Sequence, residues 1–541
     1  MAIVIINNQE VEIGDSERLN GIQAAERAGV EIPHYCWHAG LSVVASCRMC
    51  LVENGSKDKE TGKVMMQPKL VPACQTPAKD GSIFITDSDK VRTARAQVEE
   101  SLLIDHPIDC PICDKAGECS LQDYHFEHGQ KERRADIRPF TSRKREMGDT
   151  VTLFVDRCVM CTRCVRFCRE ISGSAELMVI NRGSHEEIDV LPGFPLENKL
   201  SGNVVDLCPV GALGDRDFLY QQRVWFLKRR ASVCTGCSTG CSIWGEENQD
   251  RLWRLKPREN PHVNQWWMCD EGRYGYHHVH SEDRQVGPRK READGATANV
   301  EWATLPDELT ATLKKAGRLA AVLSPHLTVE EAYLLAHYIR GLDPQAVLAL
   351  GPIPVEGADE KFANGFTIRA EKCPNRRGVE EVVRFFGGLT SFDEFLKELD
   401  KGEIRAAWVS GGYKTDWIDA ATADRFSHLD TLIVQDMFVS PLWELATYQL
   451  PGGSFAERDG SYVNHADRLQ RATWIVRPPS GAWVEGALYW RLQSRPGLYD
   501  SRRILAEVAA EIPYFNVAWG EIPETGVDLK INQLAANSVS T

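Results

Sequence analysis

The chain has 541 residues and a formal net charge of −14 at neutral pH. This length exceeds what a single hydrophobic core usually serves, so we expect several domains. The acidic balance argues against general nucleic-acid binding, and no apolar run approaches the roughly eighteen residues of a membrane-spanning helix. We therefore expect any link to a membrane to run through partner proteins.

Seventeen cysteines indicate metal chemistry rather than disulfide bonds. Pairs with the spacing Cys-x2-Cys recur along the chain without a small, loop-rich frame, and we expect no signal peptide at the N-terminus. So many thiolates suit the reducing side of a membrane. Fifteen of the cysteines, together with one histidine, fall into four sets of four, and each set has the spacing of metal ligands.

The first set follows a segment with the order of elements found in plant-type ferredoxins. Alternating residues predict a strand and hairpin over residues 4–13, and a helix is expected over residues 16–28. Four cysteines follow, with ten residues in the first gap where plant ferredoxins have four. The segment therefore predicts a β-grasp ferredoxin domain over residues 1–80 that binds a [2Fe–2S] cluster through Cys36, Cys47, Cys50 and Cys74.

The second set contains a histidine and follows a predicted helix over residues 89–104. Its spacing is His106-x3-Cys110-x2-Cys113-x5-Cys119. The three cysteines lack a fourth partner unless a histidine serves, so His106 is the expected ligand and His125 is the competitor. A neutral imidazole in place of a thiolate makes a [4Fe–4S] cluster less negative, which raises its reduction potential. We assign this helical cluster domain to residues 81–125.

The third set is the densest group of cysteines in the chain. Cys158, Cys161 and Cys164 are each separated by two residues, and Cys208 follows further on with Pro209 behind it. This pattern is typical of one copy of the bacterial two-cluster ferredoxin motif. It predicts a ferredoxin-like domain over residues 140–225, with one [4Fe–4S] cluster held by Cys158, Cys161, Cys164 and Cys208.

The second cluster of such a ferredoxin is expected to be lost. Counting back from Cys208, the other three ligand positions of the second copy hold Asn198, Ser201 and Val204. Cys168 occupies the fourth position of the first copy and would have served the lost cluster. We therefore interpret Cys168 as a buried, unligated thiol.

The fourth set lies on a tryptophan-rich segment, residues 226–282. A third [4Fe–4S] cluster is expected there on Cys234, Cys237, Cys241 and Cys269. Taken alone, such a set is as typical of zinc as of a cluster, but beside three other sets the cluster is favoured. Three glycines of the segment are expected to bring backbone amides close to the cluster sulfides: Gly236, Gly240 and Gly245.

In order and spacing, the four sets resemble the large iron–sulfur subunit of respiratory complex I, the bacterial G-type or mitochondrial 75-kDa family of NADH:quinone oxidoreductase. The resemblance implies an electron relay with one [2Fe–2S] and three [4Fe–4S] clusters, in which no residue acts as acid, base or nucleophile. It also places the fourth cluster off the main electron path. The implied partners are a flavoprotein NADH-binding subunit and the iron–sulfur subunits of the quinone module. The chain would be held through them, peripherally, on the cytoplasmic side of the inner membrane.

From about residue 272 the pattern changes to alternating strands and helices. Apolar strands are expected at residues 320–323, 346–350 and 431–434, and helices at residues 328–340 and 379–386. This alternation predicts a parallel sheet covered on both faces, in an α/β domain over residues 283–541. The whole chain is thus predicted to be a multidomain α/β and α+β protein.

The stretch Ser454–Asn464 resembles a motif of the molybdopterin oxidoreductases. The metal-ligating cysteine or selenocysteine of the formate dehydrogenases follows a helix like that at residues 328–340, but residues 347–351 contain no cysteine here. We interpret Cys373 as an ordinary thiol. Neither a P-loop nor a convincing Gly-x-Gly-x-x-Gly after a strand is found, so no nicotinamide or flavin site is expected. We expect no molybdenum cofactor and interpret the domain as a truncated relic scaffold.

Two other functions remain open. The first is the electron-transfer subunit of an NAD-linked formate dehydrogenase or hydrogenase, because iron hydrogenases and soluble diaphorase subunits share the first three sets. The second is a zinc-binding structural protein. Such a protein would be colourless, whereas iron–sulfur clusters give broad absorption bands in the visible range.

Overall fold

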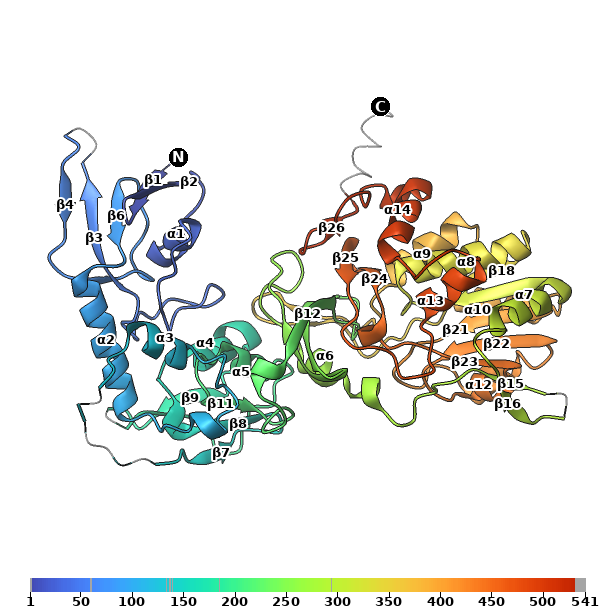
Figure 1. The fold of residues 1–541 in the computed structure, drawn as a ribbon, viewed down its shortest axis with the longest axis horizontal. Coiled ribbons are helices and arrows are strands. Elements are labelled where there is room, and N and C mark those ends of the chain that lie inside the picture. Colours follow the sequence, from blue (N-terminus) through green and yellow to red (C-terminus); the bar gives the residue numbers. More distant parts are fainter. Residues whose placement is uncertain are drawn as a thin grey trace. The chain divides into compact units, whose positions relative to one another are not determined.

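The computed structural model describes residues 2–530 except for eight positions: Lys59, Glu60, Arg133, Asp136, Ile137, Pro139, Ser184 and Ala293. The chain forms two compact units (Figure 1). Unit 1 comprises Met1–Leu227 with Phe362–Gly365, and unit 2 comprises Lys228–Lys361 with Phe366–Thr541. None of the helices in the described part of the chain combines the length and the apolar character that crossing a bilayer requires.

Unit 1 begins with a six-stranded sheet in the order β2-β1-β6-β3-β4, with β5 paired to β3. Val4 and Ile6 of the first strand are fully buried while Ile3 is exposed, as expected for a strand with one face on the core. Asn7 and Asn8, with φ of 47° and 69°, form the turn of the predicted hairpin. The strands are β1 (Ala2–Ile6), β2 (Gln9–Ile13), β3 (Leu51–Lys57), β4 (Val64–Met66), β5 (Val71–Pro72) and β6 (Ser82–Ile85).

The first helix is shorter than the sequence predicts. α1 spans Gly21–Arg27 and does not begin near residue 16. The Asn20 side chain accepts the backbone N–H of Gln23 at 3.0 Å, and the Gln23 side chain accepts that of Asn20 at 3.1 Å. This reciprocal pair satisfies two backbone donors and fixes the start of the helix.

The rest of unit 1 is built from short elements. The second helix, α2 (Asp89–Ile104), has the predicted bounds, and Ser88 caps it by accepting the N–H of Val91. A three-stranded antiparallel sheet and a separate two-stranded ladder follow. The remaining elements of this unit are α3 (Ser120–His128), β7 (Lys144–Glu146), β8 (Val151–Phe154), α4 (Arg163–Phe167), β9 (Leu177–Ile180), β10 (Glu187–Val190), α5 (Asn203–Leu207) and β11 (Leu213–Asp215).

Unit 2 starts with an antiparallel sheet of β12 (Lys228–Val233), β13 (Ser242–Asn248) and β14 (Arg251–Pro257), followed by α6 (Asp270–Tyr274). A second antiparallel sheet comes from the end of the chain: β24 (Gly460–Val463), β25 (Arg468–Ala472) and β26 (Val527–Asp528). Val233 packs with Tyr462 and Ala472 in a small core. Segments more than 200 residues apart in sequence therefore meet around the fourth cysteine set.

The main sheet of unit 2 has seven strands in the order β16-β15-β23-β22-β21-β17-β18. Five of them run parallel and are almost wholly apolar: β17 (Leu319–Leu323), β18 (Val347–Leu350), β21 (Ala406–Ser410), β22 (Thr431–Asp436) and β23 (Tyr448–Pro451). Such continuous apolar runs are typical of strands buried on both faces.

Helices cover both faces of this sheet, as predicted (Figure 1). Alternate residues of β17 belong to different cores: Ala321 and Leu323 to one, Ala320 and Val322 to the other. The first core includes α7 (Leu305–Lys315), α8 (Val329–Leu342), α9 (Arg376–Phe385), α13 (Glu485–Leu492) and α14 (Ser501–Glu511). The second includes α10 (Phe392–Leu399), α11 (Ala420–Asp424) and α12 (Pro441–Leu445).

One edge of the sheet departs from the prediction of a parallel sheet. β15 (Arg289–Arg291) pairs antiparallel with β23, and β16 (Thr297–Asn299) pairs antiparallel with β15. These two strands are short and polar, so they carry no hydrophobic pattern that predicts a strand. Helix α9 also begins three residues before the expected residue 379.

Candidate iron–sulfur sites

The four cysteines of the first set lie together at one end of the six-stranded sheet. Cys36 and Cys47 come from the loop between α1 and β3, Cys50 directly precedes β3, and Cys74 follows β5. The Cys36 sulfur hydrogen-bonds with Cys47 and Cys74, and Cys74 also hydrogen-bonds with Cys50. Those contacts lower the pKa of Cys36 and raise that of Cys74. The structure therefore brings together all four residues that the sequence predicts.

Backbone amides turn toward sulfur in two of the sets. Ala45 and Arg48, with φ of 51° and 61°, flank Cys47, and the N–H groups of Ser46 and Cys47 hydrogen-bond the Cys36 sulfur. Left-handed backbone at non-glycine residues costs roughly 1–3 kcal/mol and is found mostly at functional sites. The strain has a use here, because successive inward N–H groups form a concave site for negative charge.

The same backbone device recurs around Cys161 in the third set. Met160 and Thr162, with φ of 48° and 58°, flank this cysteine, and the Met160 N–H donates to Cys158 Sγ at 3.4 Å. The four cysteines of the set line one cavity, with Leu153 and Ile188 among the apolar residues that close it. The prediction that Cys208 joins the three closely spaced cysteines agrees with this cavity.

Cys168 does not line that cavity. It is fully buried in the short π-helix Cys168–Ser172, and its thiol hydrogen-bonds with Ser172. Burial raises the pKa of the Cys168 thiol to about 12. A protonated, hydrogen-bonded thiol in an apolar setting is inert, in keeping with the interpretation of Cys168 as an unligated residue.

The second set lies between α2, α3 and the turn that joins them. His106, Cys110 and Cys119 line one pocket, together with His125 and Phe126 of α3. Cys113 faces a different neighbour: a Cβ added at Gly211 would lie 2.2 Å from Cys113 Sγ, so the sequence needs glycine there. Gly211 lies three residues after Cys208, and this contact therefore joins the second set to the third.

Both candidate histidines of the second set have a buried Nδ1 atom without a hydrogen-bond partner. Burial, with help from Arg157, lowers the pKa of His106 to about 4, so its imidazole is neutral as a metal ligand must be. The Nδ1 atom of His125 packs against its own helix end, 2.4 Å from where a Cβ of Gly129 would stand. Both histidines border the pocket, and the choice between them stays a prediction.

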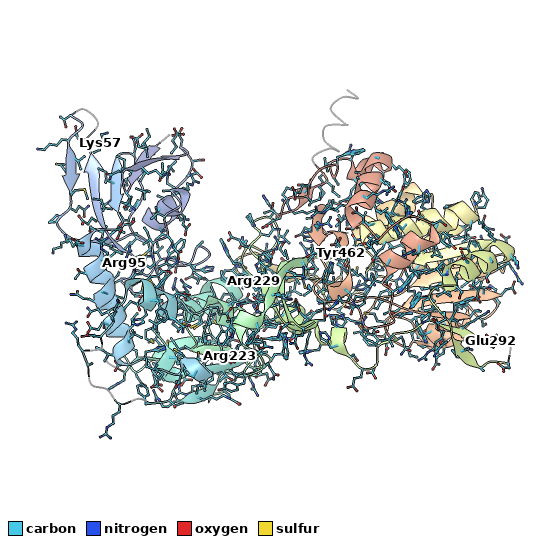
Figure 2. The ribbon with its side chains drawn as sticks, viewed as in Figure 1. Lys57, Arg95, Arg223, Arg229, Glu292 and Tyr462 are labelled. Atoms are coloured by element: carbon cyan, nitrogen blue, oxygen red, sulfur yellow. The ribbon has the colours of Figure 1, made fainter. Side chains whose placement is uncertain are left out.

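Arginines that the sequence analysis did not single out hold the second set in place. Arg223, labelled in Figure 2, donates to the carbonyl oxygens of Cys113, Pro111 and Cys110 at 2.9, 3.0 and 3.2 Å. Arg157 pairs with Asp109 at 2.9 Å, and both side chains are buried. Arg157 directly precedes Cys158, while Asp109 directly precedes Cys110. The pair thus ties the third set to the second.

The fourth set surrounds a cavity in unit 2. All four of its cysteines line the cavity, together with Met268, Phe366 and Ile368. The N–H of Gly236 donates to Cys234 Sγ at 3.5 Å, and that of Gly272 donates to Cys269 Sγ at 3.3 Å. The prediction for Gly245 is wrong: it lies in β13, where a Cβ would come within 2.3 Å of Ile475, so close packing of the sheet requires this glycine.

The chemistry of the four sets suits iron–sulfur clusters. Burial raises the pKa of the thiols of Cys119, Cys161 and Cys234 to about 11. Thiolates at these positions need a positive charge beside them, which cluster iron supplies. Across the described residues, no group of three or more His, Cys, Asp or Glu side chains is arranged to hold a metal ion. A cubane spreads its four thiolates over four irons rather than gathering them on one ion.

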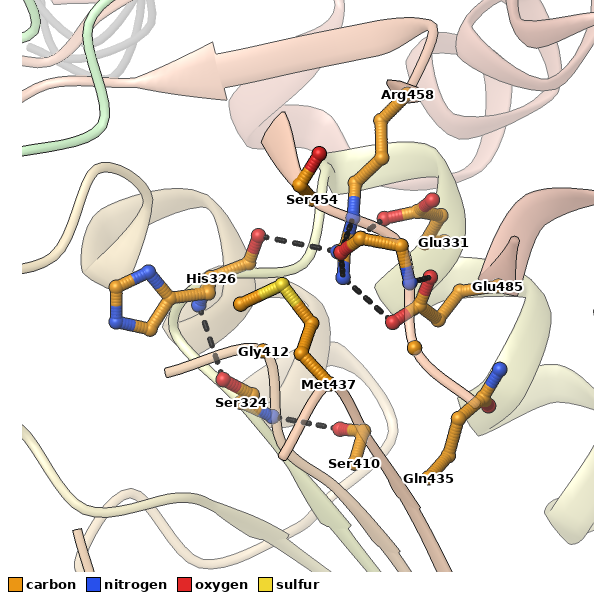
Figure 3. Close-up of polar contacts among 12 residues, drawn as sticks. Ser324, His326, Glu331, Ser410, Gly412, Gln435, Met437, Ser454, Arg458 and Glu485 are labelled. Carbon is orange, nitrogen blue, oxygen red and sulfur yellow. Dashed lines mark hydrogen bonds and ion pairs between the residues drawn. The ribbon is translucent and has the colours of Figure 1, made fainter. Parts of the chain in front are cut away.

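A buried ion network lies where the parallel strands of unit 2 end (Figure 3). Arg458, from the stretch that resembles the molybdopterin oxidoreductases, pairs with Glu331 at 3.1 Å and with Glu485 at 2.5 Å. It also donates to the carbonyl oxygen of His326 at 3.3 Å. All three ion-pair side chains are at most 2% exposed. Loss of one partner would leave a buried charge unpaired, so this network stabilises the domain.

The side chains beside this network do not suit a molybdenum cofactor that needs a thiolate or selenolate ligand. A small cavity there is lined by residues such as His278, His326, Lys414 and Arg458, and no cysteine is among its lining residues. Cys373 is fully buried outside it. No chemical step of molybdenum is therefore assigned to this chain.

Family models match four consecutive segments. Residues 4–88 match a 2Fe-2S iron-sulfur cluster binding domain, and residues 95–134 match the NADH-ubiquinone oxidoreductase-G iron-sulfur binding region. Residues 148–214 match the ferredoxin-like domain of NADH-quinone oxidoreductase subunit 3, and residues 227–281 match the molybdopterin oxidoreductase Fe4S4 domain. Each segment contains one of the four ligand sets.

Curated relatives carry the name of the G subunit of NADH-quinone oxidoreductase. The protein of Rickettsia prowazekii is 35% identical over 62% of this chain and 48% of its own length. That of Streptomyces coelicolor is 35% identical over 59% of this chain and 37% of its own length, and that of Pseudomonas fluorescens is 32% identical over 63% and 36%. The chain thus matches about half, or less, of the length of these relatives.

A solved NAD+-reducing [NiFe]-hydrogenase in the H2-reduced state is also similar, at 25% identity over 41% of this chain and 91% of the hydrogenase chain, with a TM-score of 0.35. The predicted resemblance is confirmed by the curated relatives and by the family models. Over about 62% of its length, this chain is a homologue of the G subunit of NADH-quinone oxidoreductase, the large iron–sulfur subunit of complex I.

Proposed function

We propose that this chain is the electron-transfer subunit of an NADH:quinone oxidoreductase. It relays electrons from a flavoprotein that oxidises NADH toward the subunits that reduce quinone. The observation that carries the proposal is the gathering of distant cysteines into buried sets, two of which enclose a cavity with all four of their members. The homology to the large iron–sulfur subunit of complex I supports the same function.

We assign one cluster to each set. A [2Fe–2S] cluster in a β-grasp ferredoxin domain is held by Cys36, Cys47, Cys50 and Cys74. Three [4Fe–4S] clusters are held by His106, Cys110, Cys113 and Cys119, by Cys158, Cys161, Cys164 and Cys208, and by Cys234, Cys237, Cys241 and Cys269. The finer domain boundaries at residues 80, 125, 140, 225 and 282 belong to the same proposal.

The protein's own contribution is to position the ligands and to shape their surroundings. Bound clusters exchange single electrons, so a flavin on a partner has to split the two-electron hydride of NADH. The chain holds its thiolates on loops braced by Arg157 and Arg223, and it keeps water away with apolar side chains such as Leu153 and Met268. N–H groups that donate to cysteine sulfurs stabilise the extra negative charge of a reduced cluster.

Partners supply the remaining parts of the pathway. The proposed partners are the NADH-binding flavoprotein and the iron–sulfur subunits of the quinone module. They hold the chain peripherally on the cytoplasmic side of the inner membrane. The α/β domain of unit 2 serves as a scaffold without molybdenum, and the fourth cluster lies off the main path.

The experiment uses the purified full chain with reconstituted clusters. Dithionite should reduce the clusters, whereas NADH, formate and hydrogen should not. Addition of the flavoprotein partner should make NADH an effective donor, and Cys208→Ala should slow electron delivery to an acceptor dye while the matched control Cys373→Ala does not. Formate-dependent dye reduction with bound molybdenum would overturn the proposal in favour of a formate dehydrogenase.

A further inference from the structure

Two arginines of α4 reach the loops of both the first and the third ligand sets. Arg166 donates through Nη2 to the carbonyl oxygen of Cys161 at 3.1 Å and to that of Cys36 at 2.5 Å. Its Nη1 atom donates to the carbonyl oxygen of Ser42. A single guanidinium group therefore bonds to the backbone of a cysteine from each set, and these two cysteines are 125 residues apart.

Arg163 repeats this arrangement one turn earlier on the helix. Its Nη2 atom donates to the carbonyl oxygen of Trp37 at 2.5 Å, and its Nη1 atom donates to that of Leu207 at 3.3 Å. Trp37 directly follows Cys36, and Leu207 directly precedes Cys208. Both arginines thus join the backbone next to Cys36 to the backbone next to ligands of the third set.

These guanidinium groups lack a carboxylate counter-charge. Within the described part of the chain, their hydrogen bonds go to carbonyl oxygens, and neither group forms an ion pair. The Nε atom of each is buried without a partner, and Arg166 is only 8% exposed. Arg157 differs, because Asp109 neutralises it. A buried cation is costly unless a negative charge lies close by.

We propose that Arg163 and Arg166 are positioning residues that hold the first and third clusters at a fixed spacing and place positive charge beside both. The inference rests on the proposed function, since thiolate-ligated clusters supply the missing negative charge. A fixed cation near a cluster favours its reduced, more negative state and so raises its reduction potential. Arginine suits the task better than lysine, because its planar fork donates to two loops at once and stays charged when buried.

The test is a redox titration of the reconstituted full chain, followed by EPR. Arg166→Gln removes the charge, Arg166→Lys keeps the charge but loses the fork, and Arg163→Gln tests the second arginine. Arg169→Gln is the matched control, since Arg169 is an exposed arginine one turn further along. The signals are assigned beforehand with Cys36→Ala for the first set and Cys208→Ala for the third.

The expected result is a shift of both midpoint potentials to more negative values in Arg166→Gln and in Arg163→Gln. Arg166→Lys should restore most of the potential, because the charge returns, and Arg169→Gln should leave both potentials unchanged. The magnetic interaction between the two reduced clusters should weaken in Arg166→Lys, because the loops are no longer tied together. A role in folding alone would not produce this separation of charge from geometry.

The inference is overturned if both signals persist in the two Gln variants with unchanged midpoint potentials. If Arg166→Gln fails to assemble its clusters, Arg163→Gln and Arg166→Lys decide by the same readout. Failure of the proposed function is distinguishable, because it is seen in the unmodified chain as missing iron or as a missing signal from the first or third set.

Discussion

Arg157 and Asp109 form a buried ion pair, with Nη2 and Oδ2 2.9 Å apart, between the segments that carry Cys158 and Cys110. The backbone N–H of Ser142 donates to the same carboxylate at 3.1 Å. The Arg157 guanidinium group also lies over the ring of Phe154, 4.0 Å from its centroid. The second and third ligand sets therefore share one charged contact, which neither set could replace by itself.

Asp109→Asn should destabilise unit 1 strongly. The change leaves the Arg157 charge buried without a partner, and breaking such a pair costs about 3–5 kcal/mol. Asp87→Asn is the control, because Asp87 and Arg92 form an exposed pair, with side chains 68% and 54% exposed, whose loss should cost less than about 1 kcal/mol. Denaturant unfolding of the full chain, followed by near-ultraviolet circular dichroism, measures both. Equal midpoints for the two variants would show that the buried pair is not important for stability.

His106→Cys should keep a cubane in the second set but lower its midpoint potential. A thiolate adds negative charge where a neutral imidazole stood. His106→Ala should abolish the EPR signal of this cluster, whereas His125→Ala should preserve it. If the signal instead disappears in His125→Ala and persists in His106→Ala, the ligand is the histidine of α3.

Cys208→Ala should remove one cubane signal, and Cys168→Ala should leave every signal intact. The first thiol lines the cavity of the third set, and the second is hydrogen-bonded to Ser172 outside it. Low-temperature EPR of the reduced chain distinguishes the two variants. The opposite outcome would make Cys168 the fourth ligand and would refute the lost-cluster interpretation.

The stability of unit 2 should fall as the pH rises from about 4.5 to 7. Burial raises the pKa of Glu330 to about 7, above its value in the unfolded chain, so the folded state binds more protons in this range. The stabilising effect of the protonated form is complete below the unfolded pKa and is lost as the pH passes the folded one.

Glu330→Gln should flatten this pH dependence, because the amide is neutral at every pH and can still accept a hydrogen bond from Ser461. Glu282→Gln, at an exposed position, is the matched control. Denaturant midpoints at pH 5 and pH 7.5 provide the comparison. Identical pH profiles for the unmodified chain and Glu330→Gln would show that another group controls the effect.

Local patterns in the sequence predicted the ligand sets well. Metal ligands at spacings such as Cys-x2-Cys lie on one short loop, so the sequence alone brings most of each set together. The bounds of α2 were also predictable, because Ser88 provides a clear helix start. The apolar strands of the main sheet were found for the same reason, since burial on both faces leaves a continuous apolar run.

Contacts between distant segments could not be predicted from the sequence. Arg166 contacts Cys36 across 130 residues, and Arg157 contacts Asp109 across 48 residues. A single sequence gives no pairing information for such contacts, and arginines in loops are usually solvated. The start of α1 was misplaced because residues 16–20 read as helix until the reciprocal caps of Asn20 and Gln23 are seen. Gly245 was misassigned because the packing of Ile475 against it comes from a segment 230 residues away.

The most direct test of the account is the metal content of the full chain after anaerobic reconstitution, together with EPR of the reduced protein. One [2Fe–2S] and three [4Fe–4S] clusters predict about fourteen iron atoms per chain and four distinguishable cluster signals, each lost on substitution of a ligand from its own set. Saturation at about ten irons would mean that one proposed set holds no cubane. A colourless protein with stoichiometric zinc would contradict the central claim that the chain carries electrons.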